Sequence, residues 1–533
     1  MPKTSQPTKT MPHPAFSIAS AVALFLLLVF LCGCASRGVA LRPTRDNDGK
    51  SLAKAPPAMA HYIETTNVTG PVVSCSFVEF DERGDYLDFA QHTNAWNVVR
   101  DLSKANPQGL LVIIYCHGWK NNVQSGDVVE FNHFLLQIAR SKPVREAGHR
   151  VHGVYLGWRG NVVAPYVDTK SEDFRETTDA FGGPIVDTGA ARTLKYFSPK
   201  FISENLCYWN RKGAAEDKVS GVPMARTIFT LAHAAKAMPR ERETNQVFVI
   251  GHSFGALMLE RSLGQACVGA ITASWPWGRI ELAAQASAPA PPLPFDGILF
   301  VNSAAPSIHT KGLADLLWAH RSALHHAGSD DWDAPVIISL TSSADWATGV
   351  AHRVANVLAP LYPSLQRNYF EGVLQTTTAE KDRHPAVQQS YFYERTPGHN
   401  PLLVNQWITN HPSPPPKDKW PANNHDAVLE HNLDSSQGTT NLFYTLDTKS
   451  GVTPWLITPE PVPPGWTDFK EHKPVQRGDY FIMRCGGRII RGHGDIWSPT
   501  AMETYAGLIR MTYLLRQEAK RKLAEQAKKP EQQ

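Results

Sequence analysis

Residues 247–255 read Val-Phe-Val-Ile-Gly-His-Ser-Phe-Gly, and this stretch decides the fold prediction. Its four leading apolar residues, mostly β-branched, predict a buried strand of a parallel sheet. Residues 256–261, Ala-Leu-Met-Leu-Glu-Arg, predict a helix that follows almost at once. The chain must then turn sharply at Ser253. Side chains at Gly251 and Gly255 would collide with the neighbouring strand and helix, which explains the two glycines.

The turn would present the hydroxyl of Ser253 beside the positive end of the following helix. A strand, a Gly-X-Ser-X-Gly turn and a helix resemble the nucleophile elbow of the α/β-hydrolase superfamily. The resemblance implies that Ser253 is a nucleophile. It also implies that the backbone N–H of Phe254 contributes to an oxyanion hole. The alternative is a structural strand–turn–helix in which the serine has no chemical role.

Apolar segments alternate with helical patterns along much of the chain. Strands are expected at 72–80, 110–116, 152–157, 297–301, 336–340 and late in the chain at 479–490. Helices are expected at 89–104, 128–141, 201–213, 222–238, 313–320 and 500–516. This alternation predicts an α/β fold, a mostly parallel sheet with helices on both faces.

Residues 359–480 break this pattern, since they are rich in Pro, Asn, His and Trp and show little periodicity. We expect them to form an insertion over the active-site end of the sheet, not a separate core. The predicted domain is thus 66–516, with this insertion between the acid and the base. A charged tail, 517–533, follows it.

The candidate acid is Asp345. In the superfamily that the elbow resembles, an acid and then a histidine follow the serine along the chain. Asp345 lies just past the carboxyl end of the strand 336–340, the end at which sites form in open parallel sheets. It could equally cap a helix that begins near Ala347. Other candidates precede their strands and so lie at the wrong end of the sheet: Asp296, Asp331 and Asp333.

The candidate base is His493, in the sequence Arg-Gly-His-Gly-Asp. This loop lies between the late strand and the last helix, which is the position of the base in the superfamily. A loop histidine can also be merely solvated. Four other histidines are rivals for the role: His399, His411, His425 and His431.

The candidate oxyanion loop is Cys-His-Gly-Trp, residues 116–119, directly after the strand 110–116. Several branches of the superfamily place a His-Gly-X sequence here, and the residue after the glycine donates its N–H. Carried over, the resemblance implies that Trp119 acts together with Phe254. The alternative is a tight turn with a buried tryptophan.

The N-terminus predicts export and attachment to a membrane. Lys3 and Lys9 precede a largely apolar run, 15–31, that ends in small residues, as in a signal peptide. The sequence Leu-Cys-Gly-Cys at 31–34 resembles the lipobox of bacterial lipoproteins, which implies cleavage after residue 33 and lipidation of Cys34. Residues 34–65 would form a tether. The alternative is an uncleaved single membrane span, for which 17 residues is about the lower limit.

Together, these features predict a membrane-tethered serine hydrolase that cleaves small-molecule or lipid esters of carboxylic acids. An acyltransferase of the same fold and an inactive envelope scaffold are the alternatives. The formal net charge of +4 is too small to indicate nucleic-acid binding. No metal or organic cofactor is implied. Cys116 and Cys267 are expected to be packing residues.

Overall fold

The computed structural model describes residues 40–46, 48–52, 60–65, 71–119, 121–160, 211–237, 244–274, 294–314, 337–352, 395–400, 403–404, 406–410, 428–435, 438–445, 455–458 and 480–509. The expected signal peptide, Cys34 and the charged tail lie outside these residues. So do the rival residues Asp331, Asp333, His411 and His425.

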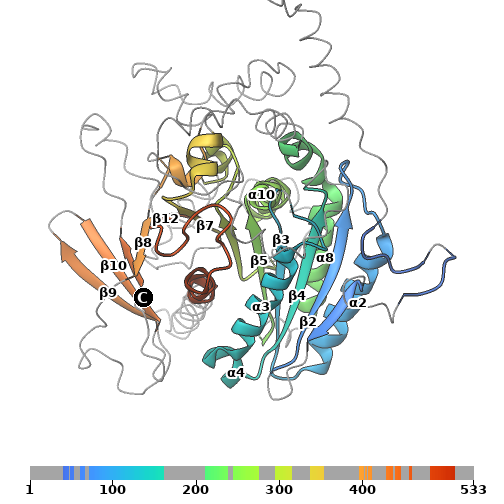
Figure 1. Cartoon of the computed structure of the whole chain (residues 1–533). Coiled ribbons are helices and arrows are strands. Elements are labelled where there is room, and N and C mark those ends of the chain that lie inside the picture. Colours follow the sequence, from blue (N-terminus) through green and yellow to red (C-terminus); the bar gives the residue numbers. More distant parts are fainter. Residues whose placement is uncertain are drawn as a thin grey trace, which may run out of the picture.

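The described strands form one twelve-stranded sheet (Figure 1). Eight neighbouring strands run parallel, and antiparallel strands extend both edges. The expected α/β class is therefore confirmed. In sheet order the strands are β1 (Tyr62–Thr65), β2 (Val73–Phe80), β4 (Arg150–Trp158), β3 (Leu110–Cys116), β5 (Gln246–His252), β6 (Gly297–Val301), β7 (Ile337–Ser342), β12 (Tyr480–Cys485), β8 (Gln406–Asn410), β11 (Trp455–Thr458), β10 (Gly438–Thr445) and β9 (Val428–Ser435).

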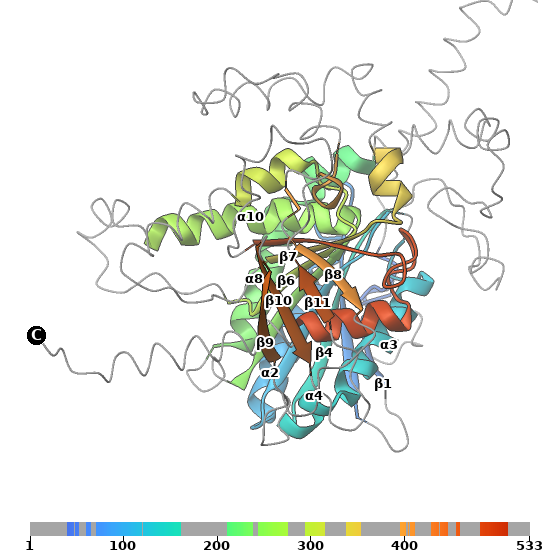
Figure 2. The same cartoon turned by 90° about the vertical axis from the view of Figure 1, so that its left-hand side faces the viewer.

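Helices pack on both faces of the sheet, as Figures 1 and 2 show from two directions. Helices α2 (Phe89–Ala105), α8 (Val222–Ala235) and α10 (Phe254–Ser274) lie on one face. Helix α3 (Gly126–Arg140) and the helical residues 499–509 lie on the other. The side chains of β3 alternate between the two cores, as the two-residue period of a strand requires.

Strand β2 has the alternating polar and apolar sequence that is typical of a half-exposed strand, but all eight of its residues are buried. Its polar side chains find partners inside the protein. Ser74 and Ser76 lie 2.8 and 3.2 Å from the two ring nitrogens of His152. Glu79 accepts hydrogen bonds from the side-chain amide of Gln91 and from the backbone. A polar–apolar alternation therefore arises here without exposure to water.

Part of the expected tether is packed against the body. The backbone N–H of Arg42 donates to Glu79, and its guanidinium donates to the carbonyl of Val123 at 2.7 Å. Strand β1 pairs with β2. Residues 40–46 and 60–65 therefore belong to the folded domain, because buried polar groups hold them there, and are not a free linker.

The segment 359–480 contains strands that its sequence did not predict. Strand β8 pairs in parallel with β12, and β11, β10 and β9 continue the sheet from there. These strands lie at one edge of the sheet in Figure 1. Residues 395–400, by contrast, lie against the end of β7, where Arg484 donates to the carbonyl of Gly398 at 3.0 Å.

Within the described residues, no helix is both long and apolar enough to cross a membrane. Cys75, Cys116 and Cys485 are buried free thiols. Cys116 belongs to one of the two cores, as expected for a packing residue.

Candidate active site

Four turns meet at the carboxyl ends of the parallel strands. They follow β3, β5, β7 and β12. These strands run parallel within a contiguous part of the sheet, so their carboxyl ends lie on the same side of it. The turns carry the four groups that the sequence singled out: the 116–119 loop, Ser253, Asp345 and His493. Open parallel sheets form their binding sites at the carboxyl ends of their strands.

The turn at Ser253 has the strained geometry expected for it. Ser253 adopts a φ of 54°, a left-handed conformation that non-glycine residues rarely adopt. Its N–H donates to the carbonyl of Val301 at 3.0 Å, and its carbonyl accepts from Ala304 and Leu257 at 3.2 and 3.1 Å. Bonds to the neighbouring strand end and to α10 therefore hold the serine in this conformation.

Both elbow glycines are required by space. A Cβ on Gly251 would lie 2.7 Å from the Cα of Ala256. A Cβ on Gly255 would lie 2.6 Å from the carbonyl oxygen of His117 and nearer still to that of Cys116. Glycine at these positions lets α10 pack directly against β5 and against the 116–119 loop.

Ser253, His493 and Asp345 form a continuous hydrogen-bonded series. The Oγ of Ser253 lies 2.8 Å from Nε2 of His493, and Nδ1 of the same ring lies 2.9 Å from Oδ2 of Asp345. A carboxylate only accepts, so Nδ1 carries the hydrogen and Nε2 is left to accept the serine proton. The serine and the histidine are 240 positions apart in the chain.

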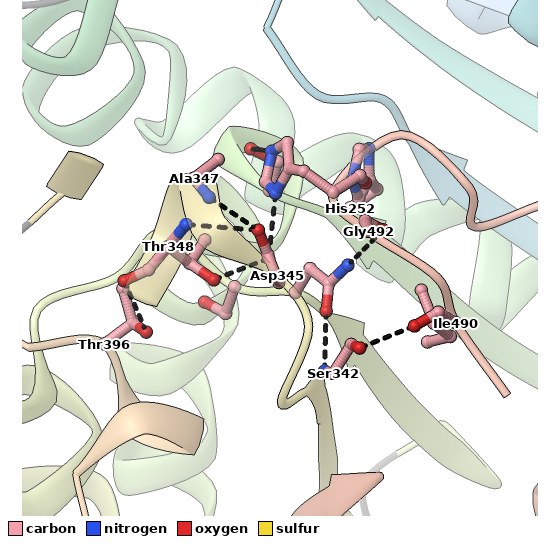
Figure 3. Close-up of polar contacts among 12 residues, drawn as sticks. His252, Ser342, Asp345, Ala347, Thr348, Thr396, Ile490 and Gly492 are labelled. Atoms are coloured by element: carbon pink, nitrogen blue, oxygen red, sulfur yellow. Dashed lines mark hydrogen bonds and ion pairs between the residues drawn. The ribbon is translucent and has the colours of Figure 1, made fainter. Parts of the chain in front are cut away.

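Asp345 also accepts hydrogen bonds from the start of the short helical segment η2 (Ala347–Ala351), as the capping alternative expects. Its Oδ1 accepts from the N–H groups of Ala347 and Thr348 at 3.0 and 3.2 Å. Its Oδ2 accepts from His493 and from the hydroxyl of Thr348 at 2.5 Å. Figure 3 shows Thr348 and Ala347 on one side of the carboxylate.

The surroundings of Asp345 keep it ionised. The residue is 1% exposed, and burial alone would raise the pKa of its carboxyl group. His493 and the hydrogen bonds from Thr348 outweigh burial, and they hold the pKa below its ordinary value. A buried carboxylate that stays charged can orient the imidazole ring of His493 and stabilise it when it is protonated.

The 116–119 loop is fixed against Ser253. His117 is fully buried, and its Nε2 accepts from the backbone N–H of Trp158 at 3.1 Å. Its Nδ1 therefore carries the hydrogen and donates to the carbonyl of Gly118 at 2.8 Å. Burial lowers the pKa of His117 to about 4, so the ring is neutral at pH 7. A Cβ on Gly118 would lie 2.9 Å from Cβ of Ser253, which shows how closely the loop approaches the serine.

Trp119 and Phe254, the two residues expected to donate to an oxyanion, come from the turns on either side of this contact. Their rings lie 6.1 Å apart between centroids. Phe254 begins α10, whose N-terminus carries partial positive charge. The positive end of α10 therefore lies next to Ser253, the residue that precedes this helix.

The sequence did not predict the role of His252, whose Nε2 lies 2.9 Å from the carbonyl oxygen of His493. Burial, followed by the nearby His493, lowers the pKa of His252 to about 3. The neutral ring must carry its hydrogen on Nε2, because the carbonyl can only accept. This residue therefore links the serine turn directly to the loop of the expected base.

Of the rival histidines, the structure describes His399 and His431, and both lie away from Ser253. The Nε2 of His399 lies 3.3 Å from the Oγ1 of Thr348, and this hydroxyl also donates to Asp345. His431 belongs to β9, four strands away from β12 in the sheet. Asp296 is paired with Lys236 at the opposite end of β6, as its sequence position predicted.

Comparison of the chain with protein-family models, with curated proteins and with solved structures found no match. The chemistry of this site is therefore inferred from its residues and their geometry.

Proposed function

We propose that the protein is a serine hydrolase of the α/β-hydrolase type that cleaves carboxylic esters. The observation that carries this proposal is the series Ser253–His493–Asp345, with contacts of 2.8 and 2.9 Å, at the carboxyl ends of parallel strands. Every hydrogen in the series has a defined donor and acceptor. The strained φ of Ser253 adds support, because such strain concentrates at functional sites.

In the first half of the reaction, Oγ of Ser253 attacks the ester carbonyl carbon while its proton passes to Nε2 of His493. The carbonyl oxygen becomes an oxyanion, stabilised by the N–H groups of Phe254 and Trp119. Asp345 stabilises the imidazolium that forms. The C–O bond to the alcohol then breaks, and His493 returns its proton to the departing alkoxide oxygen. An acyl-enzyme and a free alcohol result.

In the second half, water takes the place of the alcohol. His493 accepts a proton from the water as its oxygen attacks the acyl carbon. The bond to Oγ of Ser253 then breaks, and the serine recovers its proton. The free acid leaves. All groups required for this step are those already used in the first half.

The test is hydrolysis of chromogenic esters with short, medium and long acyl chains by the wild type and by a Ser253→Ala variant. We expect turnover by the wild type, with a preference among chain lengths, and a loss of about 10⁶-fold in kcat for the variant. Equal rates for the two proteins would contradict the proposal. Recovery of the free acid, measured by mass spectrometry, distinguishes hydrolysis from acyl transfer.

A further inference from the structure

Asn302 shares an unusual feature with Ser253. Within the described residues, these are the two non-glycine residues with positive φ, at 46° and 54°. They stand at the ends of neighbouring strands, Asn302 directly after β6 and Ser253 directly after β5. A left-handed backbone at a buried residue persists only where its surroundings fix it, and it is most frequent at functional sites.

The side chain of Asn302 bridges two turns. Its Oδ1 accepts from the backbone N–H of Ser342 at 3.0 Å, and its Nδ2 donates to the carbonyl of Gly492 at 3.4 Å. Gly492 immediately precedes His493. Asn302 is completely buried, so both contacts are made away from water.

The hydroxyl of Ser342 makes a second bridge between the same turns. It donates to the carbonyl of Ile490 at 2.6 Å and accepts from the N–H of Ala344 at 3.1 Å. Ala344 directly precedes Asp345. One hydroxyl therefore joins the turn that carries the acid to the loop that carries the base, across 148 residues of sequence. Figure 3 shows Ser342 pointing toward Ile490, with Gly492 nearby.

We infer that Asn302 and Ser342 are positioning residues for the reaction and form a polar clamp that sets the distance between His493 and Asp345. This inference rests on the proposed function. The two residues do not touch the reacting atoms, and they act through the loop at 490–493. Without the clamp, the ring of His493 would leave the narrow range of positions in which it reaches both Ser253 and Asp345.

The experiment compares ester turnover and melting temperature for variants of the full chain. Ser342→Ala removes the hydroxyl, and Ser342→Thr keeps it. Asn302→Gly removes the amide but keeps a residue that tolerates positive φ, so backbone strain is not the cause of any effect. The matched control is Ser262→Ala, since Ser262 is a buried serine that donates to the carbonyl of Ser220, also at 2.6 Å, away from the site.

We expect Ser342→Ala and Asn302→Gly to lower kcat by about tenfold or more with KM nearly unchanged, because substrate binding does not use the clamp. Ser342→Thr should recover most of kcat, and Ser262→Ala should keep it. The same pattern should appear in the rate of labelling by a fluorophosphonate. If one clamp variant does not fold, the other still tests the clamp.

An active wild type with wild-type kcat in both clamp variants would overturn the clamp and leave the proposed function intact. A loss of kcat in Ser262→Ala as large as in Ser342→Ala would also overturn it, because the effect would then follow from any lost buried bond. A wild type that neither turns over esters nor reacts with the fluorophosphonate would overturn the proposed function and, with it, this inference.

Discussion

Asp345 contacts His493 through one carboxylate oxygen, Oδ2, while its other oxygen accepts two backbone N–H groups of η2. These contacts fix the plane of the carboxylate group. A rotation about the Cβ–Cγ bond that falls short of a half-turn would break the bonds to η2 or the bond to His493. The acid is thus oriented by the start of a helix, and the orientation does not depend on the histidine itself.

Replacement of Asp345 by Asn should abolish most activity. The backbone donors at Ala347 and Thr348 require an oxygen, so the new amide NH₂ group would face Nδ1 of His493. The ring would then carry its hydrogen on Nε2 and could not accept the serine proton. We expect a fall of about 10⁴-fold in kcat, measured by ester hydrolysis. A variant within tenfold of wild type would show that Asp345 serves only as a helix cap.

Replacement of Gly118 by Ala should impair catalysis through a steric effect. The new Cβ would lie 2.8 Å from Nδ1 of His252 and 2.9 Å from Cβ of Ser253, so the loop or the serine must shift. We expect about a 100-fold loss in kcat/KM, typical of a displacement near 1 Å. Gly126→Ala is the control, because nothing lies within 4 Å of its Cβ position. Equal activity in the two variants would contradict the close contact between loop and serine.

Glu260 should make stability depend on pH. Burial raises the pKa of its carboxyl group from 4.5 to about 7, although Thr310 donates to it. The folded state thus holds the proton more tightly than the unfolded state. The stabilisation from this group is fully present below pH 4.5 and is lost as the pH rises through about 7.

The variant Glu260→Gln stays neutral and should lack this loss. The unfolding free energy of the variant minus that of the wild type should therefore rise by about 3 kcal/mol between acidic and mildly alkaline pH. Urea denaturation across this range measures the difference, and subtraction removes the contributions of groups common to both proteins. A difference that is flat with pH would show that the folded protein does not hold the Glu260 proton.

Cys34 should determine where the protein is found in the cell. The lipobox-like sequence at 31–34 leads us to propose a lipid anchor on this cysteine. A Cys34→Ser variant should move from the membrane fraction to the soluble fraction after export, with its folded domain unchanged. Membrane attachment of the variant, with the N-terminal segment retained, would instead support an uncleaved span.

The sequence predicted those parts of the site that local patterns encode. The strand, the glycine-flanked turn and the helix around Ser253 all occur in one short stretch, and Asp345 and His493 each follow a strand end. The hydrogen bonds from Asn302 to Gly492 and from Ser342 to Ile490 span 190 and 148 residues. A local sequence pattern cannot predict contacts between residues so far apart in the chain. Strands β8–β11 were missed because their residues lack a clear two-residue alternation.

The central claim is that Ser253 is a nucleophile activated by His493, and covalent labelling tests it most directly. A fluorophosphonate should form an O–P bond with Oγ of Ser253 and release fluoride. Cleavage after Arg242 and Arg261 yields the peptide 243–261, in which Ser253 is the single serine. We predict that this peptide carries the adduct in the wild type, that His493→Ala labels far more slowly, and that Ser253→Ala is not labelled. An unlabelled wild type, or an adduct on another peptide, would contradict the claim.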